Sequence, residues 1–146
     1  MIYDERPDVF RSEKAGSICF VECRGEFLLL KRAPDSYEGG LWTAAPGGKL
    51  ESGETPLEGA LREVEEETGV IFQAKQLRFI GVLYFCFPDM EYALHVFHAK
   101  VEKKPEVEIR LNEHTEYRWD TLREARKLPL MRGGQECLRF LEEGGL

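Results

Sequence analysis

The segment 57–68, LEGALREVEEET, places acidic and apolar residues on separate faces of one helix, and this constrains the chain more than any other feature. The apolar stripe recurs at helical spacing and consists of Leu57, Ala60, Leu61 and Val64. At about 100° per residue, three carboxylates share one arc beside that stripe: Glu63, Glu66 and Glu67. Glu58 and Glu65 fall on the opposite flank, where water can solvate them.

The boundaries of this helix are marked by residues that commonly begin and end helices. Thr55 can cap the first turn, Pro56 suits the first helical position, and Gly69 predicts the end.

Clustering carboxylates on one helix face is unfavourable unless something compensates their charge. Like charges three or four residues apart repel by roughly 0.2–0.5 kcal/mol per pair. A divalent cation would turn this repulsion into binding, and Mg²⁺ is commonly held by one or two carboxylates together with waters and substrate phosphates. The alternative reading is a solvated, glutamate-rich helix surface.

The loop before the helix favours a binding site over that alternative. Residues 46–54 read PGGKLESGE, and three glycines give the backbone the freedom to approach a ligand or ion closely. An ordinary turn next to a carboxylate cluster would not need this freedom.

The rest of the chain predicts a mixed α+β fold. Residues 15–22 and 26–32 are β-like runs around a turn at 23–25, so they form a predicted hairpin. Further strands are expected at about 77–87, 92–101 and 114–119, and a last helix from about 134 to 143. Without regular βαβ alternation, the order favours α+β or a layered α/β/α sandwich, and no linker divides the 146 residues.

At this point the sequence resembles the Nudix hydrolases. Nine positions fit that family's pattern GX5EX7REUXEEXGU: Gly48, Glu54, Arg62, Glu63, Val64, Glu66, Glu67, Gly69 and Val70. The resemblance implies a Nudix-type α/β/α sandwich with a mixed β-sheet, in which residues 48–70, the Nudix box, form a loop–helix–loop. It also implies one Nudix hydrolase domain over residues 1–146.

The resemblance further implies a magnesium site, with Mn²⁺ as an alternative ion. Its expected ligands are the backbone carbonyl of Gly48 and the carboxylates of Glu63, Glu66 and Glu67. Arg62 lies at the border of the acidic arc, so we expect it to orient carboxylates such as Glu54 through a charge-assisted pair.

In the reaction that the resemblance implies, a water molecule attacks a diphosphate linkage of the substrate, and this water needs a base. The sequence offers candidates outside the helix. In MutT-like members a catalytic glutamate lies six residues before a tryptophan, and Glu113 has that spacing to Trp119. Glu113 is therefore the first candidate. Glu116 is the second, and the box residues Glu63 and Glu66 are the remaining ones.

Two basic residues resemble phosphate-facing positions of MutT-like enzymes. Arg32 ends the run LLLKR and Lys49 follows the glycine pair, so both are expected to bind substrate, although either could be an ordinary surface residue. His95, His98 and His114 are candidate metal ligands, but no zinc site is expected, because His95 and His98 differ by an odd number and face opposite sides of a strand.

Composition limits the partners. A net charge of −7 argues against a basic face for duplex nucleic acid. No segment has the apolar length to cross a bilayer, and the four cysteines show no CxxC spacing, so they are read as reduced thiols. A cytoplasmic protein with a nucleotide-like small-molecule substrate is expected. A homodimer that exchanges the polar N-terminal arm is compatible with the sequence.

The expected reaction is that of a MutT-like nucleoside triphosphate pyrophosphohydrolase, which gives the monophosphate and pyrophosphate. MutT reads oxidised guanine partly through a late asparagine, but the only asparagine here is Asn112, so this role is not favoured, although a backbone amide or Arg132 could supply the contact. Two alternatives remain open: a catalytically silent ligand-sensing domain and an RNA 5′-end pyrophosphohydrolase.

Overall fold

The computed structural model describes residues 1–144, and its strands form one eight-stranded sheet. The strands are β1 (Ile2–Tyr3), β2 (Ala15–Cys23), β3 (Glu26–Arg32), β4 (Trp42–Thr43), β5 (Gly47–Lys49), β6 (Arg78–Phe87), β7 (Met90–Val101) and β8 (His114–Asp120). The helices are α1 (Pro56–Thr68), a 3₁₀ turn η1 (Ala74–Gln76), α2 (Leu122–Ala125) and α3 (Gly134–Gly144).

The sheet is mixed, as the sequence predicted. Its main path runs β1-β6-β7-β2-β3-β4, while β5 pairs with β2 and β8 pairs with β3. β2 and β7 are parallel over nine residue pairs, and the other strand pairs are antiparallel.

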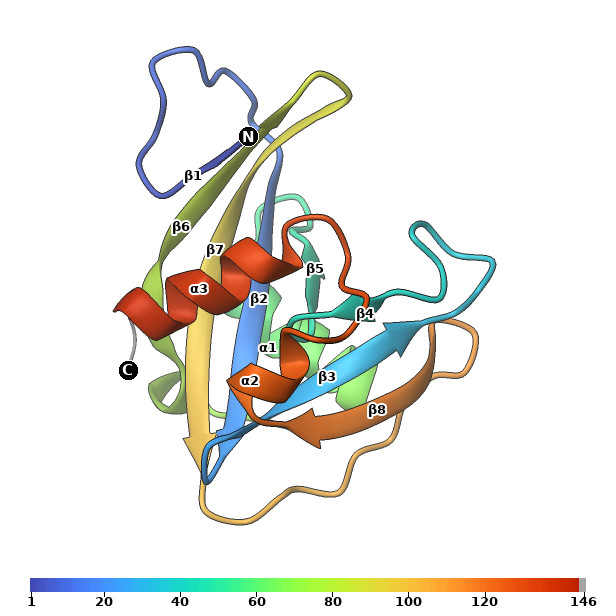
Figure 1. The fold of residues 1–146 in the computed structure, drawn as a ribbon. Helices are drawn as coiled ribbons and strands as arrows, with labels where there is room; N and C mark the ends of the chain where they lie inside the picture. The colour runs from blue at the N-terminus through green and yellow to red at the C-terminus, as the bar shows by residue number, and fades with distance from the viewer. Residues whose placement is uncertain (145–146) are drawn as a thin grey trace.

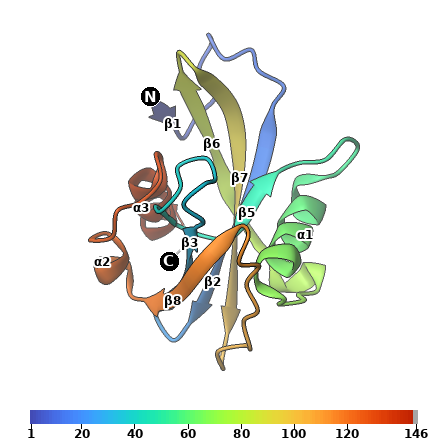
Figure 2. The same ribbon diagram turned by 90° about the vertical axis from the view of Figure 1, so that its right-hand side faces the viewer.

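Helices cover both faces of this sheet and make three layers. α1 lies on one face, and α2 and α3 lie on the other (Figures 1 and 2). A separate apolar cluster fills each interface: Leu28, Ala60, Val64 and Phe97 belong to the α1 side, and Leu29 belongs to the α3 side. The alternation of Leu28 and Leu29 along β3 supplies both layers. The predicted α/β/α sandwich is therefore confirmed.

The β2–β3 hairpin determines how the site-bearing elements are placed. Its turn has positive φ angles at Arg24 (52°) and Gly25 (82°). The two strands pair only next to this turn, at two residue pairs. Farther along, β2 pairs with β5 while β3 pairs with β8 and β4. The paired end of β3 and start of β8 therefore lie on one side of the opening between β2 and β3, and the glycines of β5, paired with β2, lie on the other.

All predicted strands and both predicted helices are present, but the sequence missed the shortest elements. β1, β4, β5 and α2 contain two to four residues, which is too short for a periodic pattern. The N-terminal arm, read only as polar, pairs through β1 with β6 and buries Phe10 edge-on against Tyr84. Its terminal ammonium donates to the Cys86 carbonyl at 2.6 Å.

Two further observations bear on the compositional expectations. All four cysteines are unpaired thiols. Within residues 1–144, no helix combines the length and apolar character that a membrane span requires.

Candidate active site

Helix α1 carries most of the acidic residues, and its start is fixed in three ways. The Thr55 hydroxyl accepts a hydrogen bond from the Glu58 amide at 3.2 Å, while the Glu58 carboxylate accepts from the Thr55 amide at 2.9 Å. The buried Ser17 hydroxyl on β2 donates to the Pro56 carbonyl at 2.7 Å. Gly69, with φ 76°, ends the helix as predicted. The carboxylates of α1 are thus held at a fixed height over β2 and β5.

Gly48 on β5 allows Glu63 to approach the backbone. A Cβ atom at Gly48 would lie 2.7 Å from the Glu63 carboxyl carbon, which real Cβ atoms essentially never do. A side chain here would therefore displace the Glu63 carboxylate.

Glu67 is the most deeply buried carboxylate of the cluster, with 7% of its surface exposed. The Gly47 amide donates to its Oε1 at 2.9 Å. Burial raises the pKa of Glu67 to about 8, and the negative charges of Glu63 and Glu113 raise it further. The Gly47 hydrogen bond and the charge of Arg32 act in the opposite direction. A cation bound here would favour the ionised carboxylate.

Arg62 donates hydrogen bonds to three carboxylates at once. Its Nε and Nη2 donate to the two oxygens of Glu54 at 2.7 and 2.8 Å, so the predicted pair is present and is bidentate. Its Nη1 donates to Glu63 at 2.8 Å and to Glu66 at 3.2 Å. The hydrogen bonds from Arg62 to Glu54 lower the pKa of Glu54 to about 2. Burial nevertheless raises the pKa of Glu63, since desolvation outweighs the contribution of Arg62.

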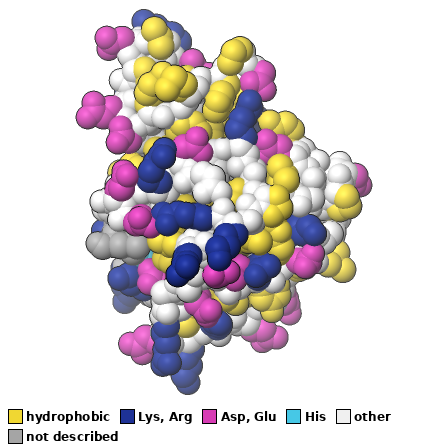
Figure 3. All heavy atoms as spheres, viewed as in Figure 1, with side chains coloured by type: hydrophobic (Ala, Val, Ile, Leu, Met, Phe, Trp, Pro, Cys, Tyr) yellow, Lys and Arg dark blue, Asp and Glu magenta, His cyan; other side chains and the backbone are white. Residues whose placement is uncertain are grey.

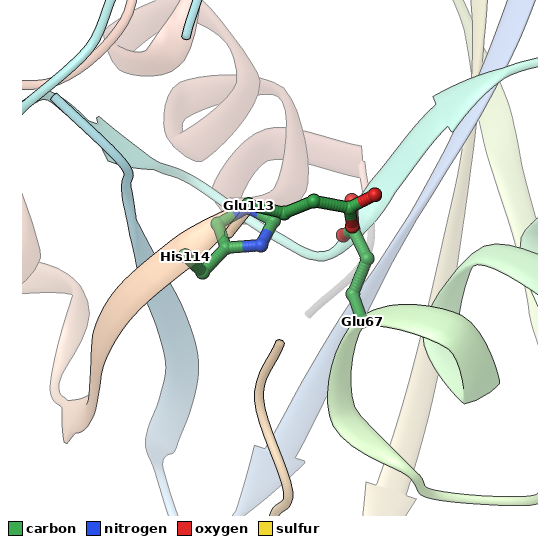
Figure 4. Close-up of side chains that lie close together, drawn as sticks. All are labelled: Glu67, Glu113 and His114. Atoms are coloured by element: carbon green, nitrogen blue, oxygen red, sulfur yellow. The ribbon is translucent and has the colours of Figure 1, made fainter. Parts of the chain in front are cut away.

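Glu113 and His114 reach the same region from β8. The Ala33 amide donates to the Glu113 carbonyl at 2.8 Å, which ties this segment to the end of β3. One ligand atom each from Glu67, Glu113 and His114 lie within 4.8 Å of one another, and Figure 4 shows the two carboxylates meeting beside the imidazole.

His114 is unusual because it is buried without a partner. It is 1% exposed, and neither ring nitrogen has a hydrogen-bond partner among the described residues. Burial, together with the charge of Arg32, lowers its pKa to about 4. The ring is therefore neutral near pH 7.

The two basic candidates lie at different depths. Arg32 pairs with His114 across β3 and β8, and its Nε donates to the Tyr37 carbonyl at 2.6 Å. Its charge acts on both Glu67 and His114, so it lies at the cluster. Lys49 is exposed at the end of β5, and its carbonyl accepts from Arg62 at 3.0 Å.

The second base candidate lies in different surroundings. Glu116 is an exposed residue of β8 and forms an ion pair with Lys31 at 3.1 Å. It is not part of the group formed by Glu67, Glu113 and His114.

The three histidines lie in different surroundings. His95 contacts the Gly16 carbonyl at 3.2 Å, and His98 contacts Glu22 at 2.7 Å, so these two do not meet. His114 was set aside with them, but it lies beside Glu67 and Glu113. Its position next to Glu113 in the chain was the available signal. The amide of Gly47 was also missed, because backbone donors leave no mark in composition.

The donor set fits a hard divalent cation. Carboxylate oxygens are the ligands that Mg²⁺ and Mn²⁺ prefer. Glu67 is buried near the negative charges of Glu63 and Glu113, and among the described residues no lysine or arginine donates a hydrogen bond to it. On the face over α2 and α3, basic and acidic side chains lie next to one another (Figure 3).

Comparison with known proteins gives a consistent result. The family model described as "NUDIX domain" matches residues 12–140. The chain is 38% identical over 124 residues to the asymmetrical bis(5′-nucleosyl)-tetraphosphatase of Mus musculus, covering 82% of this chain and 78% of the relative. It is 36% identical over 83 residues to an 8-oxo-dGTP diphosphatase of Proteus vulgaris, covering 57% of this chain and 70% of the relative. The MutT protein structure from Methanosarcina mazei Go1 superposes with a TM-score of 0.76 at 29% identity, covering 89% of this chain and 94% of that one.

Proposed function

Because the chain belongs to the Nudix family and is a Nudix hydrolase of the MutT-like kind, we propose that it hydrolyses a (deoxy)nucleoside triphosphate to the monophosphate and pyrophosphate, with Mg²⁺ as cofactor. The observation that carries this proposal is the buried Glu67 carboxylate, which lies among Glu63 and Glu113 with its pKa raised to about 8. Such a group is costly in a protein without a cationic ligand.

In this proposal Glu63, Glu66 and Glu67 hold the ion, together with the Gly48 carbonyl. A bound Mg²⁺ supplies charge neutralisation of the phosphate oxygens and acidifies a water. Arg62 fixes the orientation of Glu63 and Glu66, which is a positioning role.

Proton transfer and substrate binding fall to residues outside the helix. Glu113 accepts the proton of the attacking water, since its carboxylate faces Glu67 from the β8 side. Arg32 contacts a phosphate oxygen, because its positive charge already acts on the cluster. Lys49 is exposed at the end of β5, where it would meet a longer phosphate chain.

A second substrate is favoured by one comparison. The match to the mouse relative covers 82% of this chain, and that relative is named a bis(5′-nucleosyl)-tetraphosphatase. Hydrolysis of a dinucleoside tetraphosphate is therefore the alternative within the same chemistry. The match to the 8-oxo-dGTP diphosphatase covers less of this chain, 57%, and supports that substrate less strongly.

A substrate panel tests the proposal. The protein is incubated with Mg²⁺ and, separately, with the common dNTPs, 8-oxo-dGTP, diadenosine tetraphosphate, ADP-ribose and a 5′-triphosphorylated RNA oligonucleotide. Products are separated by ion-exchange chromatography. The expected result is a nucleoside monophosphate and pyrophosphate from a triphosphate.

The other outcomes discriminate between the rival functions. A mononucleotide and a nucleoside triphosphate from diadenosine tetraphosphate would support the alternative substrate. A 5′-monophosphorylated RNA would support RNA 5′-end hydrolysis. Calorimetric binding of a nucleotide with no product in any reaction would contradict the enzyme and indicate a sensor.

A further inference from the structure

The His114 imidazole requires a partner that the described chain does not supply. Buried polar side chains are almost always hydrogen-bonded, because leaving one unsatisfied is unfavourable. His114 is 1% exposed, yet both of its ring nitrogens lack a partner among residues 1–144. A neutral ring has one nitrogen lone pair, which can bind a proton donor or a metal ion.

Among residues 1–144, no group around this ring is hydrogen-bonded to it. The nearest functional side chains are the carboxylates of Glu67 and Glu113, whose ligand atoms lie within 4.8 Å of an imidazole nitrogen. Arg32 is the neighbouring cation, but its Nε is directed to the Tyr37 carbonyl. Neither carboxylate forms a hydrogen bond with a ring nitrogen of His114, and in their ionised, metal-binding forms both can only accept one, so the imidazole lone pair is open to a metal ion.

Two of the three groups are held in place by the fold. Glu67 is fixed on α1 by the Gly47 amide, and only one of its oxygens is used in that bond. His114 lies in the β3–β8 ladder opposite Arg32. Glu113 precedes it and is exposed, so its carboxylate can adjust to a ligand. Figure 4 shows all three side chains converging from two sides.

We propose that Glu67, Glu113 and His114 form a second metal site, distinct from the glutamate site on α1, that binds a first-row transition-metal dication through one nitrogen and two carboxylate ligands. Glu67 is shared between the two sites, so this inference rests on the proposed function. Three protein ligands leave further coordination positions for water or a phosphate oxygen.

The nitrogen ligand determines which ion this second site selects. Mg²⁺ prefers oxygen ligands, whereas imidazole binds Zn²⁺, Fe²⁺ and related ions well, and Mn²⁺ accepts both. The second site should therefore retain Mn²⁺ or Zn²⁺ in the presence of excess Mg²⁺. The α1 site, which has oxygen ligands only, should exchange Mn²⁺ for Mg²⁺.

Pulsed electron paramagnetic resonance of Mn²⁺ tests this assignment without any substrate. The full chain is loaded with Mn²⁺, excess Mg²⁺ is added, and ¹⁴N modulation of the remaining signal is recorded. We expect imidazole-type modulation in the wild type, because a coordinated ring nitrogen couples directly to the electron spin. The chain has three histidines, so the coupling can be assigned by mutation.

Three variants make the assignment. His114→Gln should abolish the modulation, whereas His95→Gln, which removes a histidine outside the cluster, should retain it. Glu113→Gln changes an exposed residue and should keep the fold while weakening Mn²⁺ binding at this site about tenfold or more by calorimetry. This last variant keeps the test decisive if His114→Gln does not fold.

The results that would overturn the proposal are specific. A wild-type signal without ¹⁴N modulation, or modulation that persists in His114→Gln, would show that His114 is not a ligand. Unchanged Mn²⁺ affinity in Glu113→Gln would remove the second carboxylate from the site. These measurements need no hydrolysis, so their failure is distinguishable from failure of the proposed reaction.

Discussion

The carboxylates of this site differ in their contacts, and those contacts suggest different tasks. Glu54 is neutralised by Arg62 and has its pKa lowered to about 2, so it is suited to holding the arginine rather than to moving a proton. Glu67 is buried and has its pKa raised to about 8. Glu113 lies opposite Glu67 on a different element, where a base could act from outside the metal helix.

The first prediction concerns Glu113. A general base contributes about 10²–10⁴-fold, so Glu113→Gln should lower kcat by that order. Glu116→Gln is the matched control, because Glu116 is an exposed residue paired with Lys31. The measurement is the kcat of both variants in steady-state kinetics, with a substrate that the wild type hydrolyses. If only Glu116→Gln were slow, the base would be misassigned, and if neither were, it would lie at Glu63 or Glu66.

The second prediction concerns Arg62. Lysine keeps the charge but cannot reproduce the bidentate bond to Glu54 together with the bonds to Glu63 and Glu66. Arg62→Lys should therefore weaken Mg²⁺ binding by about 10–100-fold in isothermal titration calorimetry. Arg123→Lys, at an exposed position of α2, should leave it unchanged. Wild-type affinity in Arg62→Lys would show that the charge alone is sufficient.

At the scale of elements, sequence pattern predicted what is long and periodic. The helix α1 was recovered from Thr55 to Gly69 because capping, apolar spacing and termination all agree. The two-residue strand β4 and the four-residue helix α2 were not predicted. The pairing of β4, for example, includes a bridge from Trp42 to Leu130, which lies far along the chain. Short elements are specified by tertiary contacts rather than by local pattern.

A third prediction tests how α1 is anchored. Ser17→Ala removes the buried hydroxyl that donates to the Pro56 carbonyl, and one such hydrogen bond contributes about 0.5–1.5 kcal/mol to stability. The free energy of unfolding, measured by urea denaturation, should fall by that amount. Ser52→Ala, an exposed change in the loop before the helix, should have little effect. Equal stabilities of the two variants would contradict the anchoring role.

At the scale of the whole molecule, the site depends on segments that are distant in sequence. The pattern of residues 48–70 indicated Glu63, Glu66 and Glu67, and the structure places them on one helix. The neighbouring position of Glu113 was a local signal for His114, but that His114 and Arg32 lie side by side at this site follows only from the pairing of β3 with β8. The burial that raises the pKa of Glu67 likewise results from the packing of α1 on the sheet.

A fourth prediction concerns pH and metal. The pKa of Glu67 is raised from about 4.5 to about 8 in the folded chain. Between these values the folded state keeps a proton that the unfolded state releases, so this group lowers stability as pH rises from 4.5 to 8. Metal-free wild type should therefore lose stability over this range relative to Glu67→Gln, which cannot titrate.

Added Mg²⁺ should reverse this effect in the wild type. Because the ion binds the ionised carboxylate, the Tm should rise more at pH 8 than at pH 5. Differential scanning calorimetry of both proteins at the two pH values provides the comparison. If the Tm changed with pH to the same extent in the wild type and in Glu67→Gln, or if Mg²⁺ left the Tm of the wild type unchanged at both pH values, the carboxylate cluster would be only a solvated surface.

The most direct test of a metal-dependent hydrolase is Mg²⁺-supported product formation by the wild type and by Glu67→Gln. Glutamine matches the protonated form of Glu67 in size and can leave the Gly47 contact in place, so the circular dichroism spectrum and fold should be preserved. Turnover of the substrate, followed by chromatography at saturating Mg²⁺, should fall by orders of magnitude. Near-wild-type turnover in Glu67→Gln would contradict the central claim that this buried carboxylate holds the catalytic ion.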